Sequence, residues 1–452
     1  MTTRAQDAAN FRGAVTRNPL DRVAWHNLAS AEGDLGRLIQ AEEAARRAIA
    51  LGITAPETRL VLARALQGQR RLDDAQRVFE EAIALRPAYA DAHRDLAQLI
   101  WMRGGDTASA LVPLDAALAE APADPSLHLI RSIVLEFAGD LPGAIAAADA
   151  GIAQAPKDTA LLRQASHLCL ESGDTPRAMT LAQRASQFAR PNSVPEMITS
   201  CEALLAAGRI EEADATAEAI VKALPGNQYA LALQATTWRI RGDKRYAAMC
   251  DYKTMVQAQK LDTPPGFESL EAFLLALTVE LENLHAFEAH PLQQSVRGGS
   301  QLHIQEAEIA RPLIGALFGS IAAAVQRHLQ ALGPGADILR ARNTGKFGFS
   351  GAWSVRLRSG GHHTDHVHPQ GWISSACYIS LPEGVGAGGN SRAGWLRLGQ
   401  PPIPTLPAIR ADHHVKPEPG LLVLFPAYMW HGVEPFTSDG QRLSVAFDVV
   451  PA

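Results

Sequence analysis

The chain has 452 residues, several times the length of a small domain, so its length predicts two or more domains with large cores. Its formal net charge of −5 at pH 7 provides no general basic surface, which argues against nucleic acid and anionic membrane as partners. The 4 cysteines form no Cys-x-x-Cys motif, and no stretch has the apolar core of a signal peptide or approaches about 18 apolar residues, so we expect a cytoplasmic protein that does not enter a membrane.

A repeated pattern with a spacing of 34 or 35 residues extends from the start of the chain to about residue 257. Its most regular mark is an alanine, found at Ala41, Ala75, Ala110, Ala144, Ala178, Ala213 and Ala247. This spacing is that of the tetratricopeptide repeat, in which small residues are needed where the two helices of a unit cross closely. Residues 1–257 are therefore predicted to form an all-α tetratricopeptide superhelix of about seven full repeats.

The predicted superhelix would present a concave face to solvent. Stacked helix pairs of this kind form extended concave binding surfaces. We therefore expect the repeat domain to bind a peptide or a protein, as substrate or partner. The alternative is a scaffold or an arm that joins two copies of the chain into a homodimer.

A second domain is expected over residues 258–452, because a proline-containing stretch at 261–266 interrupts the helical pattern. Apolar residues then recur at helical spacing over 270–284 and 309–332, which predicts helices that brace a sheet. From residue 351 the spacing of apolar residues changes to two. This change predicts short strands separated by glycine and proline turns, at 353–358, 362–368, 372–381, 394–398, 413–415, 421–425 and 442–450.

The number and spacing of these strands are typical of a jelly-roll barrel, with a core over about residues 340–452. The glycine-rich run 384–389 predicts a loop at the rim of this barrel. It does not predict a nucleotide-binding motif, because no helix follows it.

Histidines and a carboxylate are concentrated in the predicted strand 362–368. Residues two apart on a strand point to the same face, so His366 and His368 form one pair of ligands, and His363 with Asp365 forms a rival pair on the opposite face. We favour the first pair. His431, at the end of a distant apolar run, would complete a set of three ligands and leave about half of an octahedral iron open.

A cation follows His431 by eleven residues. The planar guanidinium of Arg442 can donate two parallel hydrogen bonds to a carboxylate, and Ser444 on the same face of the strand can add a hydroxyl. Tyr378, in the strand after the histidine cluster, offers a further hydroxyl to such a ligand, or else packs in the core. The pattern indicates a site for an anionic ligand next to the metal.

The His-x-His-Pro segment at 366–369, with His431 and the Arg442-x-Ser444 pair, resembles the Fe(II)- and 2-oxoglutarate-dependent oxygenases, in particular a bacterial subgroup that keeps His-x-His-Pro. The resemblance extends back to residues 290–299. It implies a double-stranded β-helix in which His366, His368 and His431 hold Fe(II). It also implies that Arg442, Ser444 and Tyr378 bind 2-oxoglutarate and that dioxygen is the oxidant. Many members of this superfamily use His-x-Asp, which residues 363–365 match, so the choice of pair stays open.

The resemblance and the repeats together predict a dioxygenase that hydroxylates an aliphatic C–H, in a peptide or protein side chain presented by the repeat domain. One alternative is a non-catalytic scaffold or sensor, in which the repeats bind a protein and the barrel only binds ligand. Another is a cupin-type metal enzyme that uses no 2-oxoacid. Such an enzyme would not need the Arg442-x-Ser444 pair.

Overall fold

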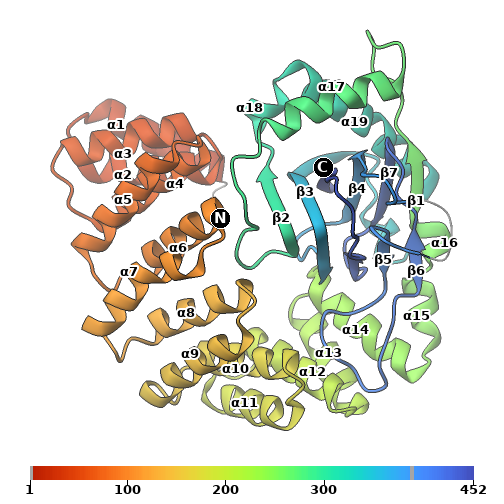
Figure 1. The fold of residues 1–452 in the computed structure, drawn as a ribbon, viewed down its shortest axis with the longest axis horizontal. Helices are drawn as coiled ribbons and strands as arrows, with labels where there is room; N and C mark the ends of the chain where they lie inside the picture. The colour runs from red at the N-terminus through yellow and green to blue at the C-terminus, as the bar shows by residue number, and fades with distance from the viewer. Residues whose placement is uncertain (1–3, 387–390) are drawn as a thin grey trace. The chain divides into compact units, whose positions relative to one another are not determined.

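The computed structural model describes residues 4–386 and 391–452, so part of the glycine-rich run 384–389 lies outside the described residues. The chain divides into two compact units, Met1–Pro156 and Lys157–Ala452. Helices make up the described part of the first unit, and the second combines helices with an antiparallel sheet (Figure 1). This division by contacts differs from the division into domains at residue 257, which stays a prediction.

The first unit is a stack of antiparallel helix pairs, preceded by one further helix. Its helices are α1 (Arg4–Arg17), α2 (Arg22–Asp34), α3 (Leu38–Ala50), α4 (Pro56–Gly68), α5 (Leu72–Leu85), α6 (Ala90–Gly104), α7 (Thr107–Glu120), α8 (Pro125–Phe137) and α9 (Leu141–Gln154). The alanines that mark the repeat are buried on the second helix of each pair, with exposed fractions of 0% or 1% at Ala41, Ala75, Ala110 and Ala144. The expected tetratricopeptide architecture is therefore confirmed.

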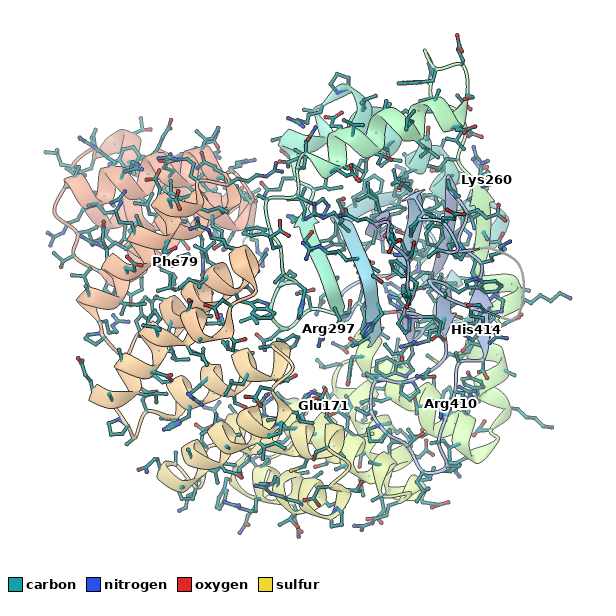
Figure 2. All side chains as sticks on the ribbon, in the orientation of Figure 1. Phe79, Glu171, Lys260, Arg297, Arg410 and His414 are labelled. Carbon is teal, nitrogen blue, oxygen red and sulfur yellow. The ribbon has the colours of Figure 1, made fainter. Side chains whose placement is uncertain are left out.

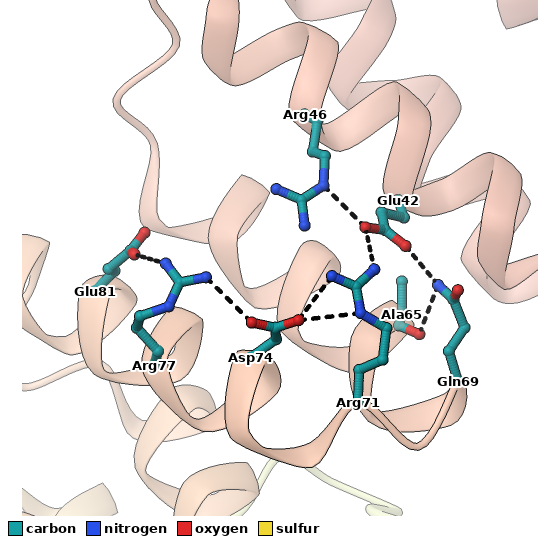
Figure 3. A network of polar contacts seen from close by, with 8 residues as sticks. All are labelled: Glu42, Arg46, Ala65, Gln69, Arg71, Asp74, Arg77 and Glu81. Atoms are coloured by element: carbon teal, nitrogen blue, oxygen red, sulfur yellow. Dashed lines mark hydrogen bonds and ion pairs between the residues drawn. The ribbon is translucent and has the colours of Figure 1, made fainter.

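Polar contacts join the first repeat to the second (Figure 3). Glu42 on α3 accepts hydrogen bonds from Arg46 (2.8 Å), from Gln69 (2.8 Å) and from Arg71 (2.7 Å). Arg71 also donates to Asp74 at 2.7 Å. Burial opposes ionisation of Glu42, but these hydrogen bonds outweigh it and lower its pKa. The network thus links α3 to the turn between α4 and α5.

The second unit begins with further helices of the same kind. These are α10 (Thr159–Glu171), α11 (Thr175–Phe188), α12 (Val194–Ala206), α13 (Ile210–Ala223), α14 (Gln228–Arg241), α15 (Lys244–Met249) and α16 (Tyr252–Met255). Ala178 and Ala213 are fully buried, as the repeat requires, whereas Ala247 is exposed. The seventh pair is incomplete because α15 has only 6 residues and the chain then turns into the sheet.

Nine strands among the described residues form one sheet, which curves into a nearly closed barrel of the jelly-roll kind. They are β1 (Gln257–Lys260), β2 (Val296–His303), β3 (Phe347–His366), β4 (Ile373–Ser380), β5 (Leu396–Leu398), β6 (His413–Val415), β7 (Leu421–Pro426), β8 (His431–Val433) and β9 (Arg442–Pro451). Their order is β1-β7-β4-β9-β3-β8-β5-β6, and β2 pairs with β3. The sequence pattern missed β1, β2 and β8, and the expected strands 353–358 and 362–368 form a single strand, β3.

The expected bracing helices are present as α17 (Leu270–Glu282) and α19 (Pro312–Leu332), with the short α18 (Glu306–Ile309) and the 3-10 turn η1 (Arg340–Arg342). Figure 1 shows α17 and α19 at one end of the strands and α13 to α15 at the other. Ile314, Leu317 and Ile321 of α19 are fully buried in the core that also contains Phe273 of α17. No helix among the residues described has the length and apolar character needed to cross a membrane.

The last repeat helices and the barrel share a second core. Residues of α12, α13 and α14 pack together with Val367, Ile403 and Trp430 of the barrel. The backbone N–H of Leu406 also donates to the carbonyl oxygen of Leu205 at 3.0 Å. This shared core explains why the second compact unit begins at Lys157, within the repeats.

Candidate metal centre

Three histidines converge at one end of the barrel. His366 ends β3, His368 follows it, and His431 begins β8 directly opposite His366 in the antiparallel pairing of these strands. The rings of His366 and His431 lie 4.1 Å apart between centroids. One ring nitrogen from each of the three histidines lies within 4.8 Å of the corresponding nitrogens of the other two. The structure thus brings together the three residues that the sequence favoured as ligands.

Backbone carbonyls orient two of these rings. Nδ1 of His366 donates to the carbonyl oxygen of Thr364 at 2.9 Å, and Nδ1 of His431 donates to the carbonyl oxygen of Met429 at 2.9 Å. Because a carbonyl oxygen only accepts, Nδ1 carries the proton in both rings and Nε2 keeps its lone pair. This is the arrangement in which a histidine binds a metal through Nε2.

A carboxylate orients the third ring. Nδ1 of His368 donates to Oδ2 of Asp448 at 2.5 Å, and the other oxygen of Asp448 accepts a hydrogen bond of 2.7 Å from Ser374. Asp448 was not among the predicted site residues. The sequence did contain a signal for it, because Ser444 and Asp448 lie two and six residues after Arg442. Alternation along β9 therefore places all three side chains on one face, and all three line the same cavity.

His366 and His431 are neutral at ordinary pH. Burial, followed by the field of the neighbouring His368, lowers the pKa of His366 from 6.5 to about 3. Burial, followed by the fields of His366 and His368, holds the pKa of His431 well below its usual value. Neutral imidazoles are the form that binds a metal, so no proton has to be removed from either ring first.

The rival pair is split in the structure. Asp365 accepts two hydrogen bonds from Arg397, at 2.8 and 2.9 Å, and one of 3.1 Å from Gln400. His363 lines the same cavity as the three histidines, and its Nδ1 lies 3.0 Å from the hydroxyl of Ser295. Strict alternation placed His363 and Asp365 on one face. The pairing of β3 with β8 shifts register between residues 363 and 366, and this irregularity separates them.

Arg397 continues a charged network away from the histidine cluster. It donates to Glu434 at 3.1 Å, and Nε2 of His414 lies 3.3 Å from the same carboxylate. His414, labelled in Figure 2, belongs to β6. Asp365 is thus held in an ion-pair network, and both of its oxygens accept hydrogen bonds from Arg397, while Asp365 is not among the residues that line the cavity. Which pair binds the metal stays a prediction, and these contacts favour His366 with His368.

Arg442 is buried without a counter-ion. Its side chain is 1% exposed and donates through Nη1 to the hydroxyl of Ser444 at 3.3 Å. Its Nε has no hydrogen-bond partner, and no carboxylate pairs with the guanidinium among the described residues. A buried cation without a partner is costly, so this group is suited to an anionic ligand.

Tyr378 lies beside Arg442. The guanidinium carbon is 5.1 Å from the centre of the Tyr378 ring, and Tyr378 faces Ser444 across β4 and β9. Its hydroxyl is buried and has no hydrogen-bond partner among the residues that the structure describes. Burial raises the pKa of Tyr378, so the hydroxyl keeps its proton and can donate it to a ligand.

One cavity connects the three histidines with Arg442 and Ser444, whereas Tyr378, packed against Arg442, is not among its lining residues. It has a volume of about 340 Å³, and its lining includes the three histidines, Arg442 and Ser444. Other lining residues are mainly apolar or carry uncharged amides, such as Gln294, Gln301, Trp353, Leu396 and Phe425. Three Nε2 atoms and an unpaired guanidinium in one cavity fit a metal ion together with a small dianionic chelator.

The comparisons with known proteins agree with this chemistry. Residues 351–448 match the model of a family described as "Putative 2OG-Fe(II) oxygenase", and residues 23–51 and 60–125 match models of the tetratricopeptide repeat. The Hsp70-Hsp90 organising protein of Plasmodium falciparum is 32% identical over 77 residues, which are 17% of this chain and 31% of that protein. This chain thus spans less than a third of that relative.

Among solved structures, a tetratricopeptide repeat protein from Parabacteroides merdae is 16% identical, covers 52% of this chain and 92% of its own, and has a TM-score of 0.39. YrrB, described as a repeat protein with an unusual peptide-binding site, is 18% identical, covers 42% of this chain and 97% of its own, and has a TM-score of 0.27. The family models thus find tetratricopeptide repeats within residues 23–125 and a domain described as a putative 2OG-Fe(II) oxygenase at residues 351–448, the combination that the sequence predicted.

Proposed function

We propose that the protein is an Fe(II)- and 2-oxoglutarate-dependent dioxygenase that hydroxylates an aliphatic C–H in a peptide or protein presented by its repeats. The observation that carries this proposal is the unpaired guanidinium of Arg442, buried in the same cavity as the three clustered histidines. A purely structural barrel would have no reason to keep such a cation without a partner.

In this proposal His366, His368 and His431 hold Fe(II) through Nε2, and the other nitrogen of each ring fixes its orientation. The carbonyl oxygens of Thr364 and Met429 do this for two rings, and Asp448 does it for His368. When bound, the iron supplies activation of dioxygen, while 2-oxoglutarate supplies electrons as it is converted to succinate and CO2. The protein's own task is to hold these groups in a fixed geometry.

Arg442 would bind the far carboxylate of 2-oxoglutarate. Two parallel N–H groups of its guanidinium match the two oxygens of a carboxylate, and the hydroxyls of Ser444 and Tyr378 can satisfy the remaining lone pairs. Because Arg442 is buried, the pair forms away from water, where a charge-assisted hydrogen bond is strongest. The apolar part of the cavity wall, including Phe425, keeps water from the reacting atoms.

The repeats would bind the substrate. Tetratricopeptide arrays present concave surfaces to peptides and proteins. In the second unit the helices α12, α13 and α14 share a core with the barrel segments next to the histidines, so a substrate bound to these helices would lie near the metal site. A small metabolite would need far less surface than this array offers.

Calorimetric titration of the purified protein without oxygen tests the proposal. Fe(II) should bind first, and 2-oxoglutarate should then bind tightly only to the iron-loaded protein. His431→Ala should abolish both events. Tight binding of 2-oxoglutarate to the His431→Ala variant would contradict the proposal, and binding without any later turnover in air would favour the sensor alternative.

A further inference from the structure

Helix α14 contacts both chain segments that carry the three histidines. Trp430 directly precedes His431, Val367 lies between His366 and His368, and Pro369 follows His368. Trp430 and Val367 are 4% and 7% exposed and belong to the core that the barrel shares with α12, α13 and α14. The residues that flank the candidate ligands are therefore held by the repeat helices, within one compact unit.

Trp430 is anchored by specific contacts. Its Nε1 donates to the hydroxyl of Thr236 on α14 at 2.9 Å, and that hydroxyl donates to the carbonyl oxygen of Ala232 at 2.8 Å. Tyr229, also on α14, packs edge-on against the indole with ring centroids 5.2 Å apart. Tyr229 in turn donates to the buried carboxylate of Glu202 on α12. The indole therefore has a hydrogen bond and a ring contact on the same helix.

The segment after His368 is anchored by the start of the same helix. The backbone N–H of Gln228 donates to the carbonyl oxygen of Pro369 at 3.1 Å. Gln228 is the first residue of α14, so its N–H has no acceptor within the helix and is available to the barrel. Helix α14 thus contacts Pro369, the residue after His368, and Trp430, the residue before His431.

We propose that α14 is a positioning element of the metal centre, and that the Thr236–Trp430 hydrogen bond sets the position of His431. The inference rests on the proposed metal site. Trp430 immediately precedes β8, and its indole lies in the core shared with α14 whereas the ring of His431 lines the cavity, so Trp430 fixes the backbone of His431 from the side away from the cavity. A metal tolerates displacements of only about 0.5 Å in its ligands, so a shift of Trp430 weakens binding.

A consequence follows from thermodynamic linkage. If α14 and the metal stabilise the same arrangement, metal binding rigidifies α14, and a peptide bound to the last repeats changes metal affinity by the same factor as the metal changes peptide affinity. The metal affinity would then depend on whether a peptide is bound to the repeats. This coupling needs no movement of the barrel as a whole.

Two adjacent threonines of α14 give a matched test in the full-length protein. Thr236→Val removes the acceptor of the Trp430 N–H. Thr237→Val is the control, because Thr237 is equally buried, but its hydroxyl donates to Asp214 at 2.7 Å and to the carbonyl oxygen of Gln234 at 2.8 Å. Co(II) serves as the probe, with binding followed through its absorption spectrum.

We expect Thr236→Val to weaken Co(II) binding about fivefold, the change that the loss of one buried hydrogen bond produces. Thr237→Val should leave Co(II) affinity unchanged even if both variants lose similar thermal stability. Equal Co(II) affinities for the two variants would overturn the proposal. If Thr236→Val fails to fold, Trp430→Phe keeps a ring in the core while removing the N–H, and it must then show the weakened binding.

Hydrogen exchange provides the second readout. Co(II) should slow amide exchange in α14 of the wild-type protein, while exchange in α17 stays the same. Unchanged exchange in α14 would contradict the coupling even if Co(II) binds tightly. Failure of the proposed function looks different, because Co(II) would then still bind and protect α14, while the Fe(II)-loaded protein would not convert 2-oxoglutarate to succinate.

Discussion

Replacing Arg442 with methionine should separate ligand binding from folding stability. The side chain is 1% exposed, has no carboxylate partner among the described residues, and makes one hydrogen bond of 3.3 Å to Ser444. Methionine has a similar length and no charge, so it fills the space without the cost of burying a cation. The substitution therefore removes the cosubstrate contact and relieves an unpaired charge at the same time.

Arg442→Met should weaken the binding of 2-oxoglutarate but should not lower the free energy of unfolding. Loss of a buried, charge-assisted pair costs about 2 to 5 kcal/mol, so affinity for 2-oxoglutarate should fall by a factor on the order of 30 to several thousand. Replacement of buried charges by apolar groups is often neutral or stabilising by about 1 to 4 kcal/mol. The free energy of unfolding of the ligand-free variant should therefore stay the same or rise.

Calorimetry with 2-oxoglutarate and denaturant unfolding measure the two quantities. Arg397→Met is the matched control, because Arg397 pairs with Asp365 and Glu434, and its loss leaves a buried carboxylate unpaired. That variant should lose about 3 to 5 kcal/mol of unfolding free energy. Unchanged affinity for 2-oxoglutarate in Arg442→Met, or a loss of stability as large as that of Arg397→Met, would refute the reasoning.

The other predictions concern the ligands, the pH dependence and the compact units. His366→Ala should abolish Fe(II) binding, whereas Asp365→Asn should keep it; the reverse result would make His363 and Asp365 the ligand pair. Burial lowers the pKa of His366 from 6.5 to about 3. Between these two pH values the unfolded chain therefore binds a proton on this histidine, and the folded, metal-free protein does not. This histidine should thus lower the free energy of unfolding by about 1.4 kcal/mol per pH unit as the pH drops below 6.5. In denaturant titrations at pH 7.5 and 5.5, the free energy of unfolding of His366→Phe should depend less steeply on pH than that of the wild type. Equal slopes would contradict the burial of a neutral ring. The fragment 157–452 should stay soluble and make succinate slowly but hydroxylate a protein substrate with a raised KM, whereas 258–452 should aggregate because it exposes Val367 and Trp430. A soluble, active 258–452 fragment would show that the shared core is dispensable.

Much of the fold could be predicted from regular spacing. The alanines at intervals of 34 or 35 residues predict the helix crossings, and Ala41, Ala75 and Ala213 are fully buried as that pattern requires. The convergence of His366, His368 and His431 could also be expected, because residues two apart on a strand share a face and because the oxygenases that the motif resembles take their third histidine from a distant strand. Spacing is informative where each repeat or strand makes the same contacts.

The remaining features depend on contacts between distant residues. The separation of His363 from Asp365 results from a register shift in β3, which strict alternation cannot anticipate. The Asp365–Arg397 pair joins residues 32 positions apart, and the Trp430–Thr236 hydrogen bond joins residues 194 apart. Ala247 has the right spacing but is exposed, because the chain leaves the repeat to form β1. These features depend on tertiary packing, which the spacing of residues along the sequence does not predict.

Release of CO2 from 2-oxoglutarate labelled at C1 tests the central claim most directly. The full-length protein with Fe(II) in air should release CO2 and form succinate in equal amounts, slowly alone and faster with its substrate. The reaction should disappear in His431→Ala and when oxygen is excluded. Absence of both products from a protein that demonstrably holds Fe(II) and 2-oxoglutarate would contradict the assignment as an oxygenase.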